Sequence, residues 1–176
     1  MFDPRDPATI GYHLFFVLKG ELGERFSTVI KSLAAENGGP VFDPHLTLLA
    51  RIEGTESDVR ARTGKLAGML KPFTITAGSI AKEDAFFRAL YLLAIPSPEL
   101  SNARAKTLEV FDRNDSSYLP HFSLFYGNVS DEEKSTMEAS ITESLTFGFL
   151  VDRVYLYDTP GITETWKCIG EYPFST

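Results

Sequence analysis

One five-residue phrase occurs twice in this sequence, and the repeat limits the folds that the chain can adopt. Residues 44–48 read PHLTL and residues 120–124 read PHFSL, so both follow the pattern Pro-His-apolar-Thr/Ser-Leu. The two copies contain two of the three histidines, His45 and His121. Each copy opens a run of strand-forming residues that follows a segment with helical spacing of apolar residues. The repeat therefore predicts two halves that share one plan.

Strand and helix patterns alternate along the rest of the sequence and fit this plan. Strands are expected at residues 12–18, 45–52, 73–80, 86–95, 121–127, 150–157 and 164–170. Helices are expected between them, with one helix end at Gly38 and Gly39 and N-caps at Thr55, Ser97 and Ser130. The first half thus reads βαβαβ and the second βαβαββ. We expect one α+β domain over residues 1–176, with approximate halves 1–84 and 85–176.

The composition restricts the possible functions. The chain has 176 residues, of which 43% are apolar, and a net charge of −7. Because Lys and Arg supply most of the affinity for long nucleic acids, this charge disfavours such a partner but permits a small phosphorylated substrate. The single cysteine, Cys168, excludes a disulfide within the chain. The acidic N-terminus does not resemble a signal peptide, and no apolar run approaches the ~20 residues that a bilayer span needs. We expect a cytoplasmic monomer that enters no membrane, with the nucleus equally compatible.

The repeated phrase carries its own chemistry. Side chains alternate faces along a strand, so His45 and Thr47 share one face, and His121 and Ser123 share another. Two opposed imidazoles suit metal-free phosphodiester hydrolysis, because one can take a proton from water while the other gives a proton to the leaving oxygen. The two hydroxyls could donate hydrogen bonds to the phosphate oxygens. The alternative is a duplicated structural histidine that serves symmetric packing.

The two phrases resemble the paired His-x-Thr/Ser motifs of the 2H phosphoesterase superfamily, and further segments of the chain match as well. More narrowly, the chain resembles its eukaryotic cyclic phosphodiesterase branch. The matching segments cover nearly the whole chain and read VFDPHLTL at 41–48, FFRALYLL at 86–93, YLPHFSLFYG at 118–127 and ETW at 164–166. The resemblance implies a bilobal α+β fold, with two pseudo-symmetric βαβαβ-type halves and antiparallel sheets around a central cleft.

The resemblance also implies an activity, the metal-independent hydrolysis of cyclic phosphodiesters. The typical substrates are ADP-ribose 1″,2″-cyclic phosphate, which arises in tRNA splicing, and nucleoside 2′,3′-cyclic phosphates. By the family pattern, His121 would activate the water and His45 would protonate the leaving oxygen. Thr47 and Ser123 would hold the phosphate. No metal or other cofactor is implied.

Further candidates around the cleft follow from the same resemblance. Tyr126 matches a family tyrosine, although strict alternation would turn it away from the cleft unless the strand bulges or ends there. Phe15, and either Phe86 or Phe87, match aromatic positions that stack on the substrate, with core packing as the alternative for each. Arg88 is a candidate phosphate contact, with a solvated edge as the alternative. Arg51, which alternation puts on the face of His45, Thr47 and Leu49, is a candidate anion contact, with an end or bend of the strand before it as the alternative.

Other features of the sequence bear on the alternatives to this function. His13 has no partner at metal-ligand spacing and is expected to be structural, and the glycines at 38 and 39 lack the lysine of a phosphate-binding loop. An RNA-end 2′,3′-cyclic phosphodiesterase of the same superfamily is one alternative, which the acidic chain disfavours. A non-catalytic nucleotide-binding module is another, which the intact histidines and hydroxyls disfavour.

Overall fold

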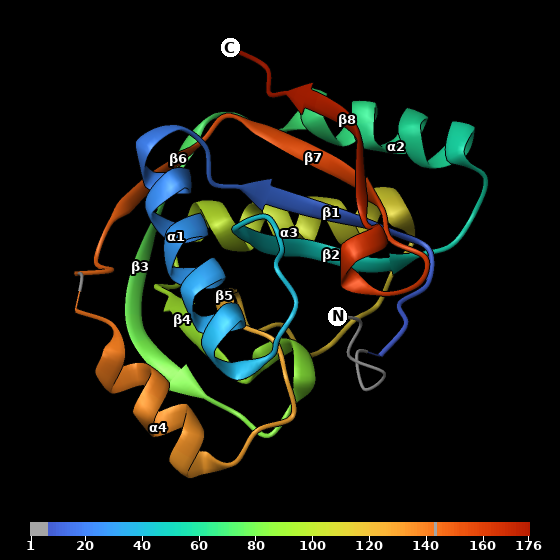
Figure 1. The fold of residues 1–176 in the computed structure, drawn as a ribbon. Helices are drawn as coiled ribbons and strands as arrows, with labels where there is room; N and C mark the ends of the chain where they lie inside the picture. The colour runs from blue at the N-terminus through green and yellow to red at the C-terminus, as the bar shows by residue number, and fades with distance from the viewer. Residues whose placement is uncertain (1–6, 143) are drawn as a thin grey trace.

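The computed structural model describes residues 7–142 and 144–176, so the N-terminal segment at 1–6 that argued against a signal peptide lies outside the described residues. The chain folds into one antiparallel sheet of eight strands in the order β6-β3-β4-β5-β2-β1-β7-β8 (Figure 1). The strands are β1 Tyr12–Val17, β2 His45–Ile52, β3 Phe73–Lys82, β4 Leu90–Ala94, β5 His121–Phe125, β6 Gly148–Val151, β7 Arg153–Asp158 and β8 Lys167–Pro173. The expected α+β class is confirmed.

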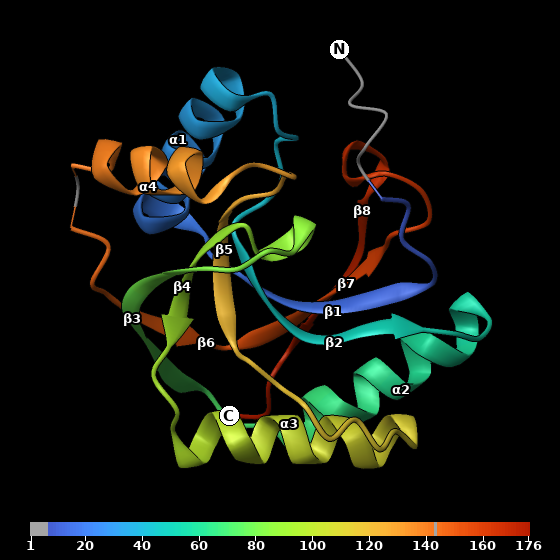
Figure 2. The ribbon, with the colours of Figure 1, turned by 90° about the horizontal axis from the view of Figure 1, so that it is seen from below.

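The four helices of the described residues lie in two groups, at opposite ends of the molecule in Figure 2. They are α1 Gly20–Asn37, α2 Glu56–Met69, α3 Pro98–Phe111 and α4 Asp131–Ser140. One group is α1, which contacts β5, with α4, which contacts β3. The other group is α2 and α3, which contact each other, and α3 also contacts β2. The helices of each sequence half are therefore shared between the two ends of the sheet.

The strands are exchanged between the sequence halves in the same way. β3, from the first half, pairs with β4 and β6, whereas β7, from the second half, pairs with β1. Residues 148–158 supply both β6 and β7, with a break at Asp152 between them. Each half of the sheet is thus completed by a strand from the other half of the sequence.

The helix ends follow the local signals of the sequence. The Thr55, Ser97 and Ser130 side chains each accept a hydrogen bond from the backbone N–H three residues on, as expected for N-caps. Helix α1 ends at Gly38, which adopts φ 75°. A Cβ atom on Gly39 would lie 2.5 Å from the Phe125 ring, so a larger residue there would push α1 away from the end of β5.

Three predicted strands differ from the observed ones. Residues 86–95 do not form one strand, because Phe86–Arg88 is a 3-10 turn and β4 begins at Leu90. The backbone N–H of Gly127 donates to the carbonyl of Phe86, which holds this turn against the end of β5. The strand expected at 150–157 is broken at Asp152, and β8 begins only at Lys167, after a 3-10 turn at Thr163–Thr165.

The junction between β2 and β5 lies at the centre of the sheet and is its weakest pairing. These two strands share a single paired position, Leu46 with Phe122, and both side chains are buried in the main core. The two halves of the sheet therefore meet at one point and separate beyond it. The repeated phrase lies at this junction, one copy on each strand.

Candidate active site

The two histidines are held by the same local structure, which the repeated proline builds. The Nδ1 atom of His45 lies 2.6 Å from the carbonyl oxygen of Asp43, and the Nδ1 atom of His121 lies 2.7 Å from that of Leu119. In both cases the acceptor is the residue before the proline, whose backbone proline keeps extended. A carbonyl can only accept a hydrogen bond, so Nδ1 carries the proton in each ring. Both neutral imidazoles therefore present an unprotonated Nε2 as a base.

The pairing of β2 with β5 brings the four predicted residues together. Leu46 is opposite Phe122 in an antiparallel pair, so this register sets His45 beside Ser123 and Thr47 beside His121. All four residues lie on the face opposite the two buried apolar residues. The predicted convergence of the two phrases on one place in the fold is observed.

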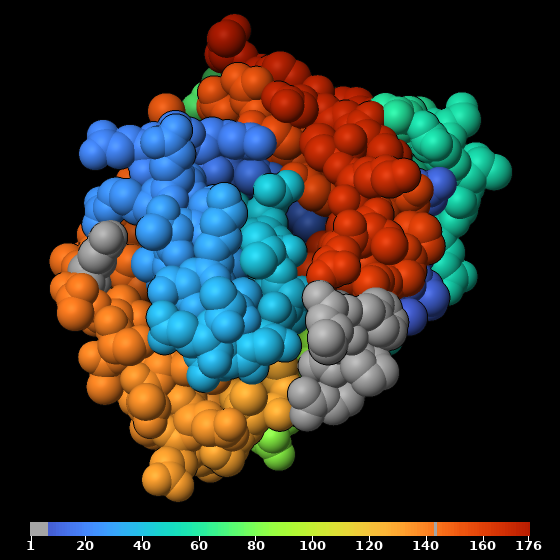
Figure 3. Space-filling model, in the orientation of Figure 1, coloured from blue at the N-terminus to red at the C-terminus, as the bar shows by residue number. Residues whose placement is uncertain are grey.

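A cavity of about 340 Å³ opens on this face. Its walls include both histidines, Thr47 and Tyr126, as predicted, together with Phe15 and Phe87. A second hollow of about 240 Å³ adjoins it and shares Phe15, His45 and Trp166. Figure 3 shows a hollow between the cyan segment around the end of α1 and the red segment before β8. The two histidines thus face a common space that is reached from outside.

The two hydroxyls of the phrase differ in their surroundings. Thr47 is half-buried and lines the cavity. Ser123 is buried, and its Oγ donates to the carbonyl oxygen of Phe87 at 2.9 Å. The Ser123 hydroxyl hydrogen is therefore engaged with the 3-10 turn in this structure, and Thr47 is the hydroxyl that faces the cavity.

Tyr126 reaches the cavity because β5 ends one residue before it. Its hydroxyl lies 3.5 Å from Nε2 of His45, and its ring stacks on Phe42 with 3.8 Å between centroids. The sequence predicted that Tyr126 would face the cleft only if the strand bulged or ended there, and β5 does end at Phe125. Tyr126 therefore combines the two expected alternatives, since it packs in an aromatic cluster and also meets a predicted catalytic group.

The three phenylalanines have different positions. Phe87 is half-buried at the cavity wall. Phe86 does not line the cavity and lies in a buried cluster with Ile30, Phe42 and Tyr126, which matches the core alternative. Phe15 is only 1% exposed, and its ring stacks on the His45 imidazole.

Burial lowers the pKa of both central histidines. For His45, burial first and the neighbouring His121 to a smaller degree lower the pKa to about 4, although the hydrogen bond to the Asp43 carbonyl opposes them. For His121 burial again lowers the pKa, while the hydrogen bond to Leu119 opposes this effect. Both rings are therefore neutral at pH 7 in the free protein.

His13 and Trp166 are among the cavity residues that were not predicted as site residues. His13 lies in the wall, where burial, His45 and Arg51 lower its pKa to about 3, and its Nδ1 is hydrogen-bonded to Oγ1 of Thr159. Trp166 also lines the cavity, with its ring stacked at 6.0 Å from that of His13. The sequence signal for Trp166 was its place in the matching segment at 164–166. No comparable signal in the sequence pointed to His13.

Within residues 7–142 and 144–176, no group of three His, Cys, Asp or Glu side chains is placed to hold a metal ion. Over the same residues, none of the helices is both long and apolar enough to cross a membrane. The cavity is lined by imidazole, hydroxyl, guanidinium and aromatic side chains.

Comparison with known proteins identifies the class. Residues 25–162 match the family model of the 2′-5′ RNA ligase superfamily. This match covers more than half of the chain, so the protein belongs to that superfamily, whose members are the 2H phosphoesterases. It is therefore an enzyme, a phosphoesterase.

A relative with a known name indicates which kind of phosphoesterase the chain resembles. The chain is 27% identical over 167 residues to a protein named cyclic phosphodiesterase from Arabidopsis thaliana, and the match covers 90% of this chain and 92% of the relative. The resemblance to the cyclic phosphodiesterase branch is confirmed.

Solved structures support the fold. A structure described as a phosphoesterase has a TM-score of 0.66 at 15% identity, covering 96% of this chain and 99% of its own. E. coli LigT in complex with 3′-AMP has a TM-score of 0.63 at 14% identity, covering 97% of this chain and 100% of its own. At these identities the likeness concerns the fold alone.

Proposed function

We propose that the protein hydrolyses small cyclic phosphodiesters by a two-histidine acid–base mechanism that uses no metal. The observation that carries this proposal is that two imidazoles, each with an unprotonated Nε2, lie around one cavity with the Thr47 hydroxyl. Proposed substrates are ADP-ribose 1″,2″-cyclic phosphate and nucleoside 2′,3′-cyclic phosphates.

The chemical step assigns one proton transfer to each ring. Nε2 of His121 takes a proton from water as the water oxygen attacks phosphorus. The bond from phosphorus to one ring oxygen breaks, and Nε2 of protonated His45 gives its proton to that oxygen. The product is a phosphomonoester beside a free hydroxyl. Thr47 donates a hydrogen bond to a non-bridging oxygen, where negative charge builds up.

The protonated state of His45 depends on the substrate. Burial holds the pKa of His45 at about 4 in the free protein, which favours the neutral ring. A bound phosphodiester places a negative charge beside the ring, and an opposite charge within ~4–6 Å raises the pKa of an imidazole. The substrate therefore helps to create the acid that completes its own hydrolysis.

The size and chemistry of the cavity support a nucleotide-like substrate. Its volume of about 340 Å³ is at the lower end of the range of ~300–1,000 Å³ that is usual for small-molecule sites. Trp166 and Phe87 offer partly exposed rings at its wall, 6.0 Å apart between centroids. E. coli LigT, which shares the fold, has been solved with 3′-AMP, NADP+ and ATP.

The test is a hydrolysis assay with chelator present. ADP-ribose 1″,2″-cyclic phosphate, adenosine 2′,3′-cyclic phosphate and a short RNA with a 2′,3′-cyclic phosphate end are compared. His45→Ala and His121→Ala should each lower kcat by about 10²–10⁴-fold. Unfolding midpoints of both variants control for loss of the fold. Full activity in either variant would remove the mechanism, and turnover that chelator abolishes would point to a metal.

An RNA-end activity is the second candidate, favoured by the superfamily match and disfavoured by the net charge of −7. A polynucleotide substrate needs a basic path that this composition does not favour. Preference for the RNA over both nucleotides in the same assay would reverse the order of the two proposals. Tight nucleotide binding without turnover would instead indicate a binding module.

A further inference from the structure

Arg51 has a backbone conformation that is unusual for a residue with a side chain. It is one of two non-glycine residues with positive φ among those described, at 54°. It lies near the end of β2, where the register with β1 shifts twice: Phe15 pairs with Thr47, Leu14 with Leu49, and Tyr12 with Ile52. Such shifts are β-bulges, which re-aim side chains and are common beside active sites.

The bulges change which residues face the cavity. Simple alternation from His45 and Thr47 would place Leu49 on the cavity face, but Leu49 is 1% exposed and lies in the main core. Ala50 and Arg51 line the cavity instead. The Arg51 side chain thus reaches the cavity because the strand is irregular.

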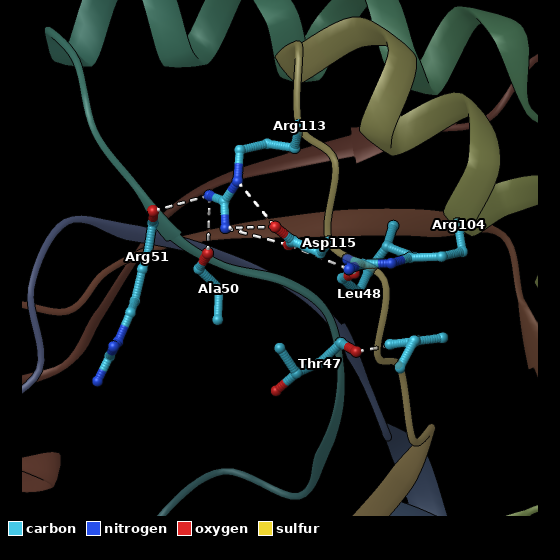
Figure 4. Close-up of polar contacts among 8 residues, drawn as sticks. Thr47, Leu48, Ala50, Arg51, Arg104, Arg113 and Asp115 are labelled. Carbon is cyan, nitrogen blue, oxygen red and sulfur yellow. Dashed lines mark hydrogen bonds and ion pairs between the residues drawn. The ribbon is translucent and has the colours of Figure 1, made fainter.

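Side chains on α3 and in the segment that follows it hold this irregular backbone, and we refer to Arg104, Arg113, Asp115 and Tyr118 as the β2 clamp; Figure 4 labels the first three. Tyr118 donates to the carbonyl of Thr47 at 3.1 Å, and Arg104 donates to that of Leu48 at 2.6 Å. Where β2 and β5 separate, these side chains take the place of β5 as hydrogen-bond donors to the carbonyl groups of β2.

Arg113 holds the part of β2 that carries Arg51. It donates to the carbonyl oxygens of Ala50 and Arg51, at 3.4 and 3.0 Å. The Asp115 carboxylate forms ion pairs with Arg104, at 3.1 Å, and with Arg113, at 3.0 Å, and so holds both guanidinium groups in place. The positive φ at Arg51 is thus supported by bonds to its own carbonyl and the preceding one.

The guanidinium of Arg51 itself is directed away from the clamp. Figure 4 shows this side chain extending from β2 on the same side as the Thr47 side chain, while only its carbonyl oxygen meets Arg113. No ion pair joins the Arg51 guanidinium to residues 7–142 or 144–176. In a chain with a net charge of −7, a cation held at a cavity without a carboxylate partner among these described residues is unexpected.

We propose that Arg51 binds a second phosphate of the substrate, one that does not react, and so selects cyclic phosphates that carry a further phosphate or diphosphate. This proposal rests on the proposed function, because it assigns one part of the same cavity. In this arrangement His45, His121 and Thr47 hold the reacting phosphate at one end of the cavity. Arg51, which follows Ala50 along β2, binds the phosphate that does not react at the other end. A guanidinium group suits this role because its planar fork forms paired hydrogen bonds with phosphate oxygens.

The test compares two substrates with the same reacting ring: adenosine 2′,3′-cyclic phosphate with a 5′-hydroxyl and with a 5′-phosphate. The wild-type protein should prefer the 5′-phosphorylated substrate by on the order of tenfold to a hundredfold in kcat/KM, mainly through KM. Arg51→Gln should remove this preference, because it should lower kcat/KM more for the 5′-phosphorylated substrate than for the 5′-hydroxyl substrate. Arg113→Met should weaken the preference too, because it releases the backbone that aims Arg51.

Arg60→Gln is the matched control, since it removes one positive charge from an exposed i,i+4 ion pair on α2, away from the cavity. It should leave the preference intact. An equal loss on both substrates in Arg51→Gln, or an equal loss of preference in Arg60→Gln, would show a general effect of charge and overturn the proposal. Absence of a preference in the wild-type protein would overturn it as well.

A binding measurement separates this proposal from the proposed function. Calorimetry with adenosine 2′-phosphate and adenosine 2′,5′-bisphosphate needs no turnover. Tighter binding of the bisphosphate, lost in Arg51→Gln, would support the second phosphate site even where neither cyclic substrate is hydrolysed. Hydrolysis of both cyclic substrates with equal binding of the two products would retain the enzyme and reject the Arg51 site.

Discussion

The imidazole of His45 lies almost flat on the ring of Phe15, with 3.8 Å between centroids and 21° between planes. Phe15 is therefore a support beneath a proposed catalytic ring. It has little surface left with which to stack on a substrate base. This contact also explains part of the burial that lowers the pKa of His45.

We expect Phe15→Leu to lower kcat by about tenfold and to change KM little. The substitution keeps an apolar side chain, but it removes the flat surface that fixes the His45 ring, and misplacing a catalytic group by ~1 Å can cost up to about 10²-fold in rate. Steady-state kinetics on adenosine 2′,3′-cyclic phosphate provide the measurement. A raised KM with an unchanged kcat would instead mean that Phe15 contacts the substrate.

Thr47 and Ser123 should differ on substitution, because only the Thr47 hydroxyl faces the cavity. Thr47→Val keeps the shape and removes the donor, and should lower kcat by about 10²–10³-fold, as for other donors to a developing negative charge. Ser123→Ala breaks the bond to the Phe87 carbonyl and should lower the free energy of unfolding by ~1 kcal/mol, with a smaller loss of kcat. Kinetics and urea unfolding of both variants test this order. A larger loss of kcat in Ser123→Ala would show that its hydroxyl turns toward the substrate.

The maximum of kcat/KM should lie at acid pH. This parameter reports the free enzyme, in which burial lowers the pKa of both His45 and His121. The active form, with one neutral and one protonated ring, is therefore most populated below pH 6.5, and kcat/KM should fall as the pH rises above that value. The kcat profile should lie at higher pH, because the bound phosphodiester raises both pKa values. A kcat/KM that rises between pH 6.5 and 8 would contradict this expectation.

Acid stability should depend on His13. Its pKa is about 3 in the folded chain against an ordinary 6.5, so between these values the unfolded chain binds the proton and the folded chain does not. Stability is therefore complete above pH 6.5 and is lost as the pH falls toward 3. His13→Asn keeps a donor for Thr159 but does not titrate, and should reduce the loss by about 1.4 kcal/mol per pH unit below 6.5.

Urea unfolding of the wild-type protein and His13→Asn at pH 7 and pH 4.5 tests this. Because His45 also resists protonation, part of the acid loss should remain in the variant. Parallel losses in the two proteins would mean that His13 does not control acid stability.

The features that could be predicted from the sequence were local ones. The caps at Thr55, Ser97 and Ser130 depend on contacts within one helical turn, and the shared face of His45 and Thr47 depends only on the period of a strand. Recognition of the paired phrase also located the residues that converge on the cavity.

The features that could not be predicted depend on partners far away in the sequence. Alternation placed Leu49 beside Thr47, but the two register shifts against β1 turn Leu49 into the core and bring Ala50 to the cavity. His13 reaches the cavity wall because β1 lies between β2 and β7. The Ser123 hydroxyl is engaged because the Phe86–Arg88 turn, from an earlier segment, lies against β5.

The exchange of strands between the sequence halves also governs when the enzyme can form. β1 has its outer neighbour, β7, about 140 positions later in the chain, at residues 153–158. Contacts this distant form slowly, because the entropy of closing the long loop must be overcome before they contribute. During synthesis, the first half would wait for the last quarter of the chain before its sheet could be completed. A ribosome-bound chain that stops after β5 would therefore contain both histidines and still lack a finished catalytic pocket.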